Sequence, residues 1–205
     1  LLTALLVFDP SEEEIKEKRV EELVDLSEQI LEKDREVKEV VDLDFERVIY
    51  LGAGSFFGLA HEAQLKILEL TAGKIATMYE SPVGFRHGPK SLINDQTLVL
   101  VFGSIDPYTR QYDLDLVREV AGDQIARQVV LLTDQVAGIE HVREVLVEAS
   151  ADLLDIYRAF PYIIYGQLIS LLTSLKVQNR PDTPSPTGTV NRVVQGVTIH
   201  PFHKE

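Results

Sequence analysis

Short, nearly continuous apolar runs recur from residue 47 onward, and segments of helical pattern separate them. Runs without polar alternation are typical of strands that are buried on both faces of a parallel sheet. The β-branched runs cover residues 47–52, 74–79, 97–102, 128–133 and 144–149, and helical patterns lie at 56–71, 108–122 and near 136–143. This alternation predicts an α/β fold, a three-layer αβα sandwich with right-handed crossovers around a five-stranded parallel sheet.

A long helical pattern fills residues 11–41, ahead of the first apolar run. Ser11, followed three residues later by Glu14, fits a capping box at the start of one long helix. The charges of this helix are interpreted as a solvated face. Its apolar stripe, at mostly three- and four-residue steps, consists of Ile15, Val20, Leu23, Leu26, Ile30, Val37 and Val40.

A second long helix is predicted over residues 160–177, with Pro161 tolerable in its first turn. It has too few polar residues for a surface helix, so we expect it to be buried, at a subunit or domain interface. The end of the chain has four prolines between residues 181 and 201 and is expected to be irregular, although residues 190–199 are apolar enough to dock. The predicted organisation is a helical segment (1–45), an α/β domain (46–180) and a tail (181–205).

The chain is acidic, because 33 Asp and Glu against 20 Lys and Arg give a formal charge of −13. This charge argues against nucleic acid and against an anionic membrane surface as partners. An anionic substrate would bind only where local cations outweigh the overall field. The absence of cysteine excludes disulfides and thiolate chemistry, and it makes the cytoplasm the simplest location.

The first eight residues, LLTALLVF, are apolar. They lack the basic flank and the cleavage site of a signal peptide, and they are too short to span a bilayer. Met78 is the only methionine, so no initiator methionine precedes Leu1. We therefore expect residues 1–8 to be the end of a core helix and the sequence to be a fragment of a longer protein.

The first predicted strand ends in LGAGS, and a helix follows. Glycines at this turn let the backbone approach a ligand, and a helix N-terminus favours an anion. Gly52, Gly54 and Ser55 are therefore candidate substrate-binding residues. A tight turn without a ligand explains the same glycines equally well.

Glu62, Lys66 and Glu69 stand at i, i+4 and i+7 of the next predicted helix, which places them on one face. Apolar residues crowd the remaining positions, so we expect this helix to be largely buried. The simple interpretation is an ordinary ion pair within one helix, worth a few tenths of a kcal/mol. The functional interpretation is a carboxylate base whose pKa is tuned by Lys66 and by burial.

The sequence GFRHGPKSLI (84–93) gathers Arg86, His87 and Lys90 in an acidic chain. Pro89 can begin a helix there, which would hold His87 at the carboxyl end of a strand, where α/β proteins bind ligands. A capping or packing histidine is the simpler explanation. The other histidines show no ligand spacing, so we predict no metal site. Asp106 before Pro107 indicates a helix start or a subunit contact, without a catalytic role.

With these segments assembled, the chain resembles the sugar isomerase (SIS) domain family. YLGAGSFFGLAHEAQLKILELTAGKI, SPVGFRHGPKSLI and RPDTPSPTGTVNRVVQGVTI are closest to the tagatose-6-phosphate ketose/aldose isomerase branch, also described as galactosamine-6-phosphate deaminases/isomerases. The resemblance implies a flavodoxin-like five-stranded sandwich. It also implies two SIS units in tandem, of which this chain matches the second and residues 1–8 the tail of the first.

The resemblance extends to the isomerase half of glucosamine-6-phosphate synthase, and it implies roles for the candidate residues. Glu69 matches the glutamate that moves a proton between C1 and C2 of the open-chain sugar. Glu62 and Lys66 match the glutamate and the lysine that precede it in the helical pattern E-x-x-x-K-x-x-E. Lys66 would hold the carboxylate of Glu69 ionised and oriented. His87 matches the histidine of ring opening, which often reaches a neighbouring subunit's site. Arg86, with Lys90, would serve the anionic sugar phosphate.

Two departures accompany the resemblance. Gln195 stands where the synthase has a lysine that contacts the sugar carbonyl. The Ser/Thr-rich loop that holds the phosphate belongs to the first SIS unit and has no convincing copy here.

The expected function is a sugar-phosphate isomerase or deaminase that uses no cofactor, acts as a homo-oligomer and works together with a first SIS unit. The alternatives are a non-catalytic SIS module that binds a phosphosugar for regulation or assembly, or only the dimerising half of a larger enzyme.

Overall fold

The computed structural model describes residues 1–188 and 196–201, and it contains one parallel sheet of five strands in the order β2-β1-β3-β4-β5. The strands are β1 (Arg47–Gly52), β2 (Ala76–Glu80), β3 (Thr97–Phe102), β4 (Gln128–Thr133) and β5 (Val142–Leu146). The central strand β1 aligns Ile49 with Met78 of β2 and with Val99 of β3. The predicted α/β fold with a flavodoxin-like sheet is confirmed.

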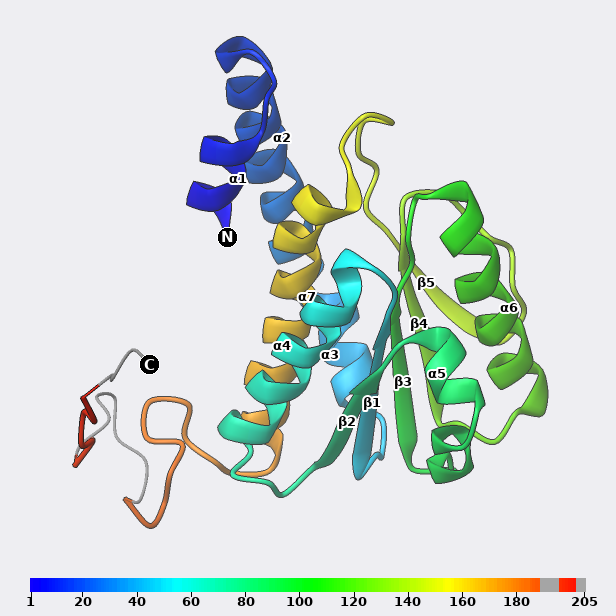
Figure 1. The fold of residues 1–205 in the computed structure, drawn as a ribbon. Coiled ribbons are helices and arrows are strands. Elements are labelled where there is room, and N and C mark those ends of the chain that lie inside the picture. The colour runs from blue at the N-terminus through cyan, green and yellow to red at the C-terminus, as the bar shows by residue number, and fades with distance from the viewer. Residues whose placement is uncertain (189–195, 202–205) are drawn as a thin grey trace.

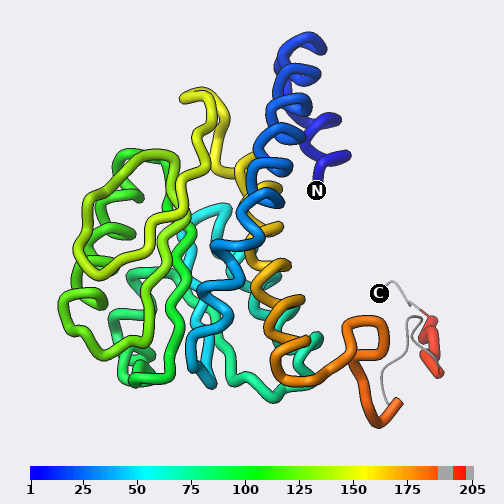
Figure 2. Tube along the Cα trace, turned by 180° about the vertical axis from the view of Figure 1, so that it is seen from behind, coloured from blue at the N-terminus to red at the C-terminus, as the bar shows by residue number. Residues whose placement is uncertain are grey.

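Helices cover both faces of this sheet (Figure 1). One layer holds α3 (Asp34–Val41), α4 (Ser55–Leu70) and α7 (Asp155–Lys176), and the other holds α5 (Pro82–Arg86) and α6 (Pro107–Asp123). A 3-10 helix, η1 (Pro89–Leu92), follows α5. α1 (Leu2–Phe8) and most of α2 (Glu13–Leu31) extend past the sheet, and Figure 2 shows α2 and α3 following α7.

Alternate side chains of the strands pack into two separate hydrophobic cores, one on each face of the sheet. Tyr50 and Leu100 pack under α4 and α7, whereas Ile49 and Val99 pack under α5 and α6. Since both faces are covered, the strand residues are apolar almost without interruption, as the sequence pattern predicts.

α4 and α7 approach each other closely where Gly166 faces Ala63. A Cβ atom at position 166 would lie 3.1 Å from the Cβ of Ala63. The predicted burial of the 160–177 segment holds for one face only. Tyr162, Tyr165 and Ile169 are fully buried against this layer, whereas Leu171 and Leu175 are 38% and 56% exposed. Its place at a subunit or domain interface stays a prediction.

The N-terminal helix differs from the prediction. The segment 11–41 is two helices, because α2 ends at Leu31 and α3 begins at Asp34. The apolar stripe has no member between Ile30 and Val37, and the charged residues Lys33 and Asp34 occupy the positions where one is expected. The capping box is also wrong. Glu12 is the N-cap, and the Ser11 hydroxyl accepts a bond from Arg19 instead.

The helix predicted near 136–143 is wrong, since these residues form a loop that leads into β5. The Glu144 carboxylate accepts the backbone N–H groups of Ala137 and Ile139 at 2.8 and 3.1 Å. Those donors are therefore not available for helical bonds. Strand β5 consequently begins at Val142, two residues before the predicted run.

Pro161 does not lie in a first turn, because α7 begins at Asp155 and contains the proline in its interior. The helix therefore lacks the hydrogen bond that an N–H at position 161 would donate to the carbonyl of Tyr157.

Candidate active site

The turn between β1 and α4 is shaped by close packing. A Cβ atom at Gly52 would lie 2.3 Å from the carbonyl oxygen of Phe56, so only glycine fits there. Gly54 is the N-cap of α4, and both it and Ser55 are exposed at the start of the helix. Packing accounts for Gly52 without a ligand, and substrate binding by these three residues stays a prediction.

The predicted row of charges lies on one face of α4. Lys66 Nζ is 3.4 Å from Glu62 Oε1 and 3.1 Å from Glu69 Oε2. Burial opposes the charge of Lys66, but its bonds and charge interactions with the two carboxylates outweigh this and raise its pKa. The structure thus brings together Glu62, Lys66 and Glu69.

This row is less sheltered than the sequence suggests. The buried face of α4 consists of Phe56, Leu59, Ala60, Ala63 and Ile67. The side chains of Glu62 and Glu69 remain 49% and 59% exposed, and Leu68 is exposed as well. The expectation of a largely buried helix is therefore wrong for this face.

Glu69 borders a hollow of about 750 Å³ at the end of α4. One wall is formed by Leu68, Glu69, Ala72, Gly73 and Lys74, and the other by residues 184–187 of the C-terminal segment. Asn179 holds that segment in place, because its Nδ2 donates to the carbonyls of Leu70 and Pro184 at 2.7 and 3.0 Å. This part of the tail therefore lies beside the candidate base. Gln195 lies outside the described residues.

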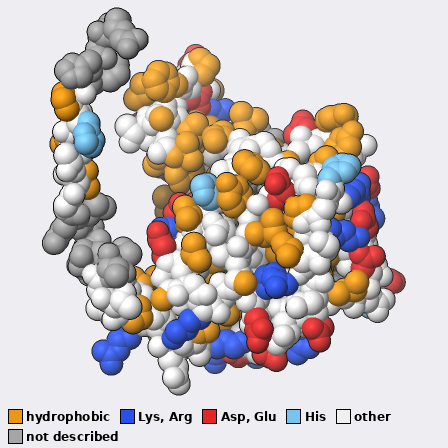
Figure 3. All heavy atoms as spheres, turned by 60° about the horizontal axis from the view of Figure 1, so that its bottom comes forward, with side chains coloured by type: hydrophobic (Ala, Val, Ile, Leu, Met, Phe, Trp, Pro, Cys, Tyr) orange, Lys and Arg blue, Asp and Glu red, His pale blue; other side chains and the backbone are white. Residues whose placement is uncertain are grey.

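Side chains are unevenly distributed over this end of the molecule. In Figure 3, hydrophobic groups gather over the centre and upper part of the face, and charged groups follow its lower and right margins. The C-terminal segment extends along one side of the body. The hollow beside Glu69 thus lies between the end of α4 and residues 184–187 of this segment.

The His87 segment lies in the opposite layer. The Ser81 hydroxyl caps α5 by accepting the N–H of Gly84 at 3.1 Å, and α5 packs against α6. His87 is exposed at the end of α5, where its backbone N–H donates to the carbonyl of Gly84 at 3.2 Å. Pro89 begins η1, as expected for a helix start. Among the described residues the His87 side chain forms no hydrogen bond.

The two cations that flank His87 are bound to carboxylates of α6. Arg86 Nε lies 2.7 Å from Glu119 Oε2, while Lys90 Nζ lies 2.5 Å from Glu119 Oε1 and 2.6 Å from Asp123 Oδ2. The bond from Lys90 lowers the pKa of Glu119. For Lys90 itself, burial is outweighed by the bonds to Asp123 and Glu119, which raise its pKa. A substrate role for Arg86 stays a prediction.

The sheet lies between Glu69 and His87 within one chain. α4 belongs to the layer with α7, and α5 belongs to the layer with α6 (Figure 1). A single chain therefore does not bring the two candidate catalytic residues into one site. Their predicted convergence, through a neighbouring subunit, stays a prediction.

At the carboxyl end of β3, part of the usual ligand position in such sheets, backbone N–H groups are bound by the chain's own carboxylates. Asp155 accepts from the Ser104 hydroxyl at 2.5 Å and from the N–H of Ile105 at 3.0 Å. Asp113 accepts from the N–H of Ser104 at 2.9 Å, and burial raises the pKa of Asp113 to about 6. Asp106 caps α6, as predicted. The N–H groups of Ser104 and Ile105 are thus not available to a phosphate, a feature that no sequence motif indicated.

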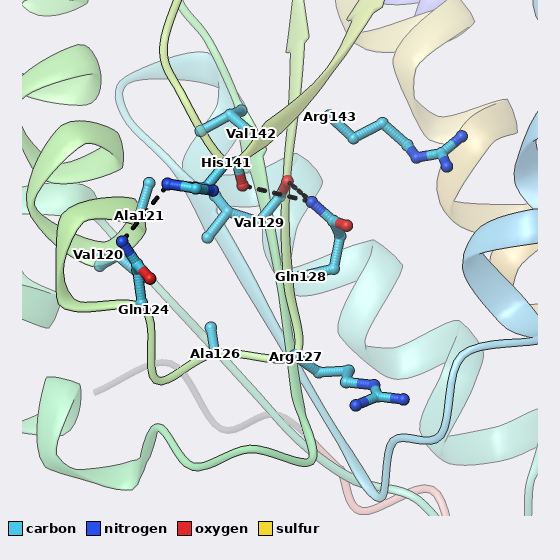
Figure 4. A pocket seen from close by; sticks show the side chains of 10 residues that line it. All are labelled: Val120, Ala121, Gln124, Ala126, Arg127, Gln128, Val129, His141, Val142 and Arg143. Atoms are coloured by element: carbon cyan, nitrogen blue, oxygen red, sulfur yellow. Dashed lines mark hydrogen bonds between the residues drawn. The ribbon is translucent and has the colours of Figure 1, made fainter.

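A second hollow of about 560 Å³ lies at the amino ends of β4 and β5 (Figure 4). His141 and Gln124 face each other there, with their Nε2 atoms 3.4 Å apart, while Arg127 and Arg143 point away from them. Arg143 pairs with Glu39 at 3.1 Å. These polar groups do not converge on one point, so we do not assign chemistry to this hollow.

No helix in the described part of the chain is both long enough and apolar enough to cross a membrane.

Comparison with known proteins relates the chain to sugar-phosphate enzymes. Residues 44–139 match the model of the SIS domain. The chain is 51% identical over 162 residues to the D-galactosamine-6-phosphate deaminase AgaS of Escherichia coli, covering 77% of this chain and 41% of that protein. It is 39% identical over 204 residues to the protein of that name from Shewanella sp. (strain ANA-3), covering 99% and 49%.

The fold agrees with the crystal structure of tagatose-6-phosphate ketose/aldose isomerase from Escherichia coli. The TM-score is 0.82 at 38% identity, and the alignment covers 99% of this chain and 52% of that one. The chain thus spans about half the length of the relatives it matches.

Proposed function

Because this chain belongs to the SIS domain family, we propose that the protein containing it is a ketose/aldose phosphate isomerase or an amino-sugar-phosphate deaminase. The names of its relatives support a phosphorylated hexose or hexosamine of the tagatose or galactosamine type as substrate. Since the chain spans about half of those relatives, we propose that a further SIS unit completes the active protein.

The observation that carries this proposal is the position of Glu69 at the wall of the hollow, with Lys66 held 3.1 Å from its Oε2. A carboxylate so placed can act as a general base. Glu69 would remove the C2 proton of the open-chain aldose, and the C–H electron pair would form the C1=C2 bond of an enediolate. Return of that proton to C1, with transfer of the O2 hydroxyl proton to O1, gives the ketose. With a 2-amino sugar the same transfer gives an imine at C2, and its hydrolysis by water releases ammonia.

His87 is proposed to assist ring opening. Since the sheet separates it from Glu69 in one chain, it would act in the site of a neighbouring subunit. This arrangement implies an oligomer as the active form.

The test uses the full-length protein and the variant Glu69→Gln, with galactosamine 6-phosphate and tagatose 6-phosphate as substrates. Deuterium exchange at C2 and C1, followed by proton NMR, should fall by about 10²–10⁴-fold, the usual contribution of a general base. Ammonia release should fall in parallel. Glu28→Gln, at an exposed position of α2, removes the same charge and should leave both rates unchanged.

A Glu69→Gln variant that exchanges deuterium at the wild-type rate would exclude Glu69 as the base. A wild-type protein that binds these sugars but neither exchanges deuterium nor releases ammonia would favour the non-catalytic module.

A further inference from the structure

The cations predicted to meet an anionic substrate are already bound to carboxylates of the chain. Lys66 contacts Glu62 and Glu69, Arg86 contacts Glu119, and Lys90 contacts Glu119 and Asp123. With a formal charge of −13, the protein needs an uncompensated cation wherever an anion is to bind.

Lys74 is such a cation, and it lines the same hollow as Glu69. Its Nζ donates to the carbonyl oxygen of Val177 at 2.8 Å. It forms no ion pair within the described ranges. A neutral carbonyl accepts one N–H and leaves the charge uncompensated, so the ammonium retains two further donors.

Lys74 lies in the turn that directly follows α4, five residues after Glu69, and backbone hydrogen bonds fix this turn. The N–H of Ala72 donates to the carbonyl of Glu69 at 3.1 Å, and the N–H of Lys74 donates to the carbonyl of Thr71 at 3.1 Å. Ala72 adopts a φ of 51°, in the left-handed region that non-glycine residues rarely use. A left-handed residue at this place commonly ends a helix, and it turns the chain after α4.

We propose that Lys74 binds an oxyanion of the substrate in this hollow, an inference that rests on the proposed function. The oxyanion has two possible sources in a sugar phosphate. One is the phosphate monoester. The other is the C1 oxygen, which gains negative charge when Glu69 removes the C2 proton and the electron pair moves into the C1=C2 bond. A cation positioned for that charge would lower the barrier.

The experiment compares Lys74→Gln, Lys74→Arg and Lys38→Gln in the full-length protein. Lys38 is exposed on α3, away from the hollow, and controls for the change in net charge. Lys74→Gln should lower kcat/KM by about ten-fold or more, as expected for loss of a hydrogen bond to a charged group. Lys74→Arg should recover most of this loss, and Lys38→Gln should match the wild type.

The kinetic pattern separates the two sources. If Lys74 holds the phosphate, KM rises and inorganic phosphate no longer competes with the substrate. If it stabilises the enediolate oxygen, kcat falls while KM is little changed. A Lys74→Gln variant equal to the Lys38→Gln control in both constants would overturn the proposal.

A second measurement does not depend on turnover. Acetylation of lysines with an N-hydroxysuccinimide ester, analysed by peptide mass spectrometry, should slow at Lys74 but not at Lys38 when galactosamine 6-phosphate is present. Protection of Lys74 in a protein without turnover would support the binding role and contradict the catalytic function. Unprotected Lys74 in an active enzyme would overturn the inference alone.

Discussion

Glu119→Gln tests whether α6 holds the His87 segment in place. Both carboxylate oxygens of Glu119 are used, one by Arg86 and the other by Lys90, the residues one position before and three positions after His87. The His87 side chain itself has no hydrogen bond in the described structure. The variant keeps the shape of the side chain but removes the charge from both pairs.

The expected loss of stability is modest, because the partners are only partly buried. The side chains of Arg86, Glu119 and Lys90 are 38%, 35% and 24% exposed. Pairs of this kind contribute up to about 1 kcal/mol each, so we expect the two pairs together to contribute at most about 2 kcal/mol. For a chain of this size that corresponds to a decrease in Tm of at most about 8 °C.

The pH dependence of this loss has a definite sign. The lowered pKa of Glu119 means that the folded protein releases this proton more readily than the unfolded chain does. Its contribution is therefore present above the unfolded value of 4.5 and disappears as the pH falls through the lower folded value. The difference between wild type and Glu119→Gln should shrink below that range.

Thermal unfolding followed by circular dichroism measures the stability, and amide hydrogen exchange over residues 84–92 measures local opening. Asp115→Asn is the matched control on the same helix, because the Arg118–Asp115 pair spans 3.3 Å between side chains that are 53% and 59% exposed. It should change Tm by much less and leave the exchange of residues 84–92 unaffected. Equal effects of the two variants would refute a specific role of Glu119.

Two further predictions concern a buried carboxyl group and the proposed acid of ring opening. Burial raises the pKa of Asp113 from 3.8 to about 6, so the folded protein holds this proton more tightly than the unfolded chain does. The free energy of unfolding should therefore fall as the pH rises from 3.8 to about 6. Asp113→Asn keeps an acceptor for Ser104 N–H and should be more stable than wild type in urea unfolding at pH 8, with little difference at pH 4; a gain independent of pH would contradict this. His87→Asn should slow turnover of the cyclic sugar phosphate more than that of an open-chain analogue, and equal slowing of both would count against ring opening.

The fold could be predicted well because its signals are local. Three predicted strands have the observed bounds, since a strand covered by helices on both faces is apolar throughout. The error near residues 136–143 has a different origin. There the Glu144 side chain takes backbone donors, and hydrophobic periodicity does not report such bonds.

The candidate site was only partly predictable. The row on α4 follows from helical spacing, but the second wall of the hollow does not. Asn179 donates to the carbonyl of Leu70, 109 positions earlier in the chain, and no local pattern indicates that contact. Lys74 was missed for the same reason, although a lysine directly after the glycine of the turn that follows the helix was the available signal. The pairing of Arg86 and Lys90 with α6 is likewise set by tertiary packing.

Because Gly166 of α7 has no side chain, α7 lies close to α4 at Ala63. Larger residues at position 166 would increase the distance between these two helices. Each carbon atom added there would press on Ala63, one turn from the ion-paired lysine, and would shift α4 outward as a rigid rod. A graded series of substitutions at this buried position would thus move the proposed base Glu69 without changing its chemistry, and the dependence of rate on that displacement could be measured directly.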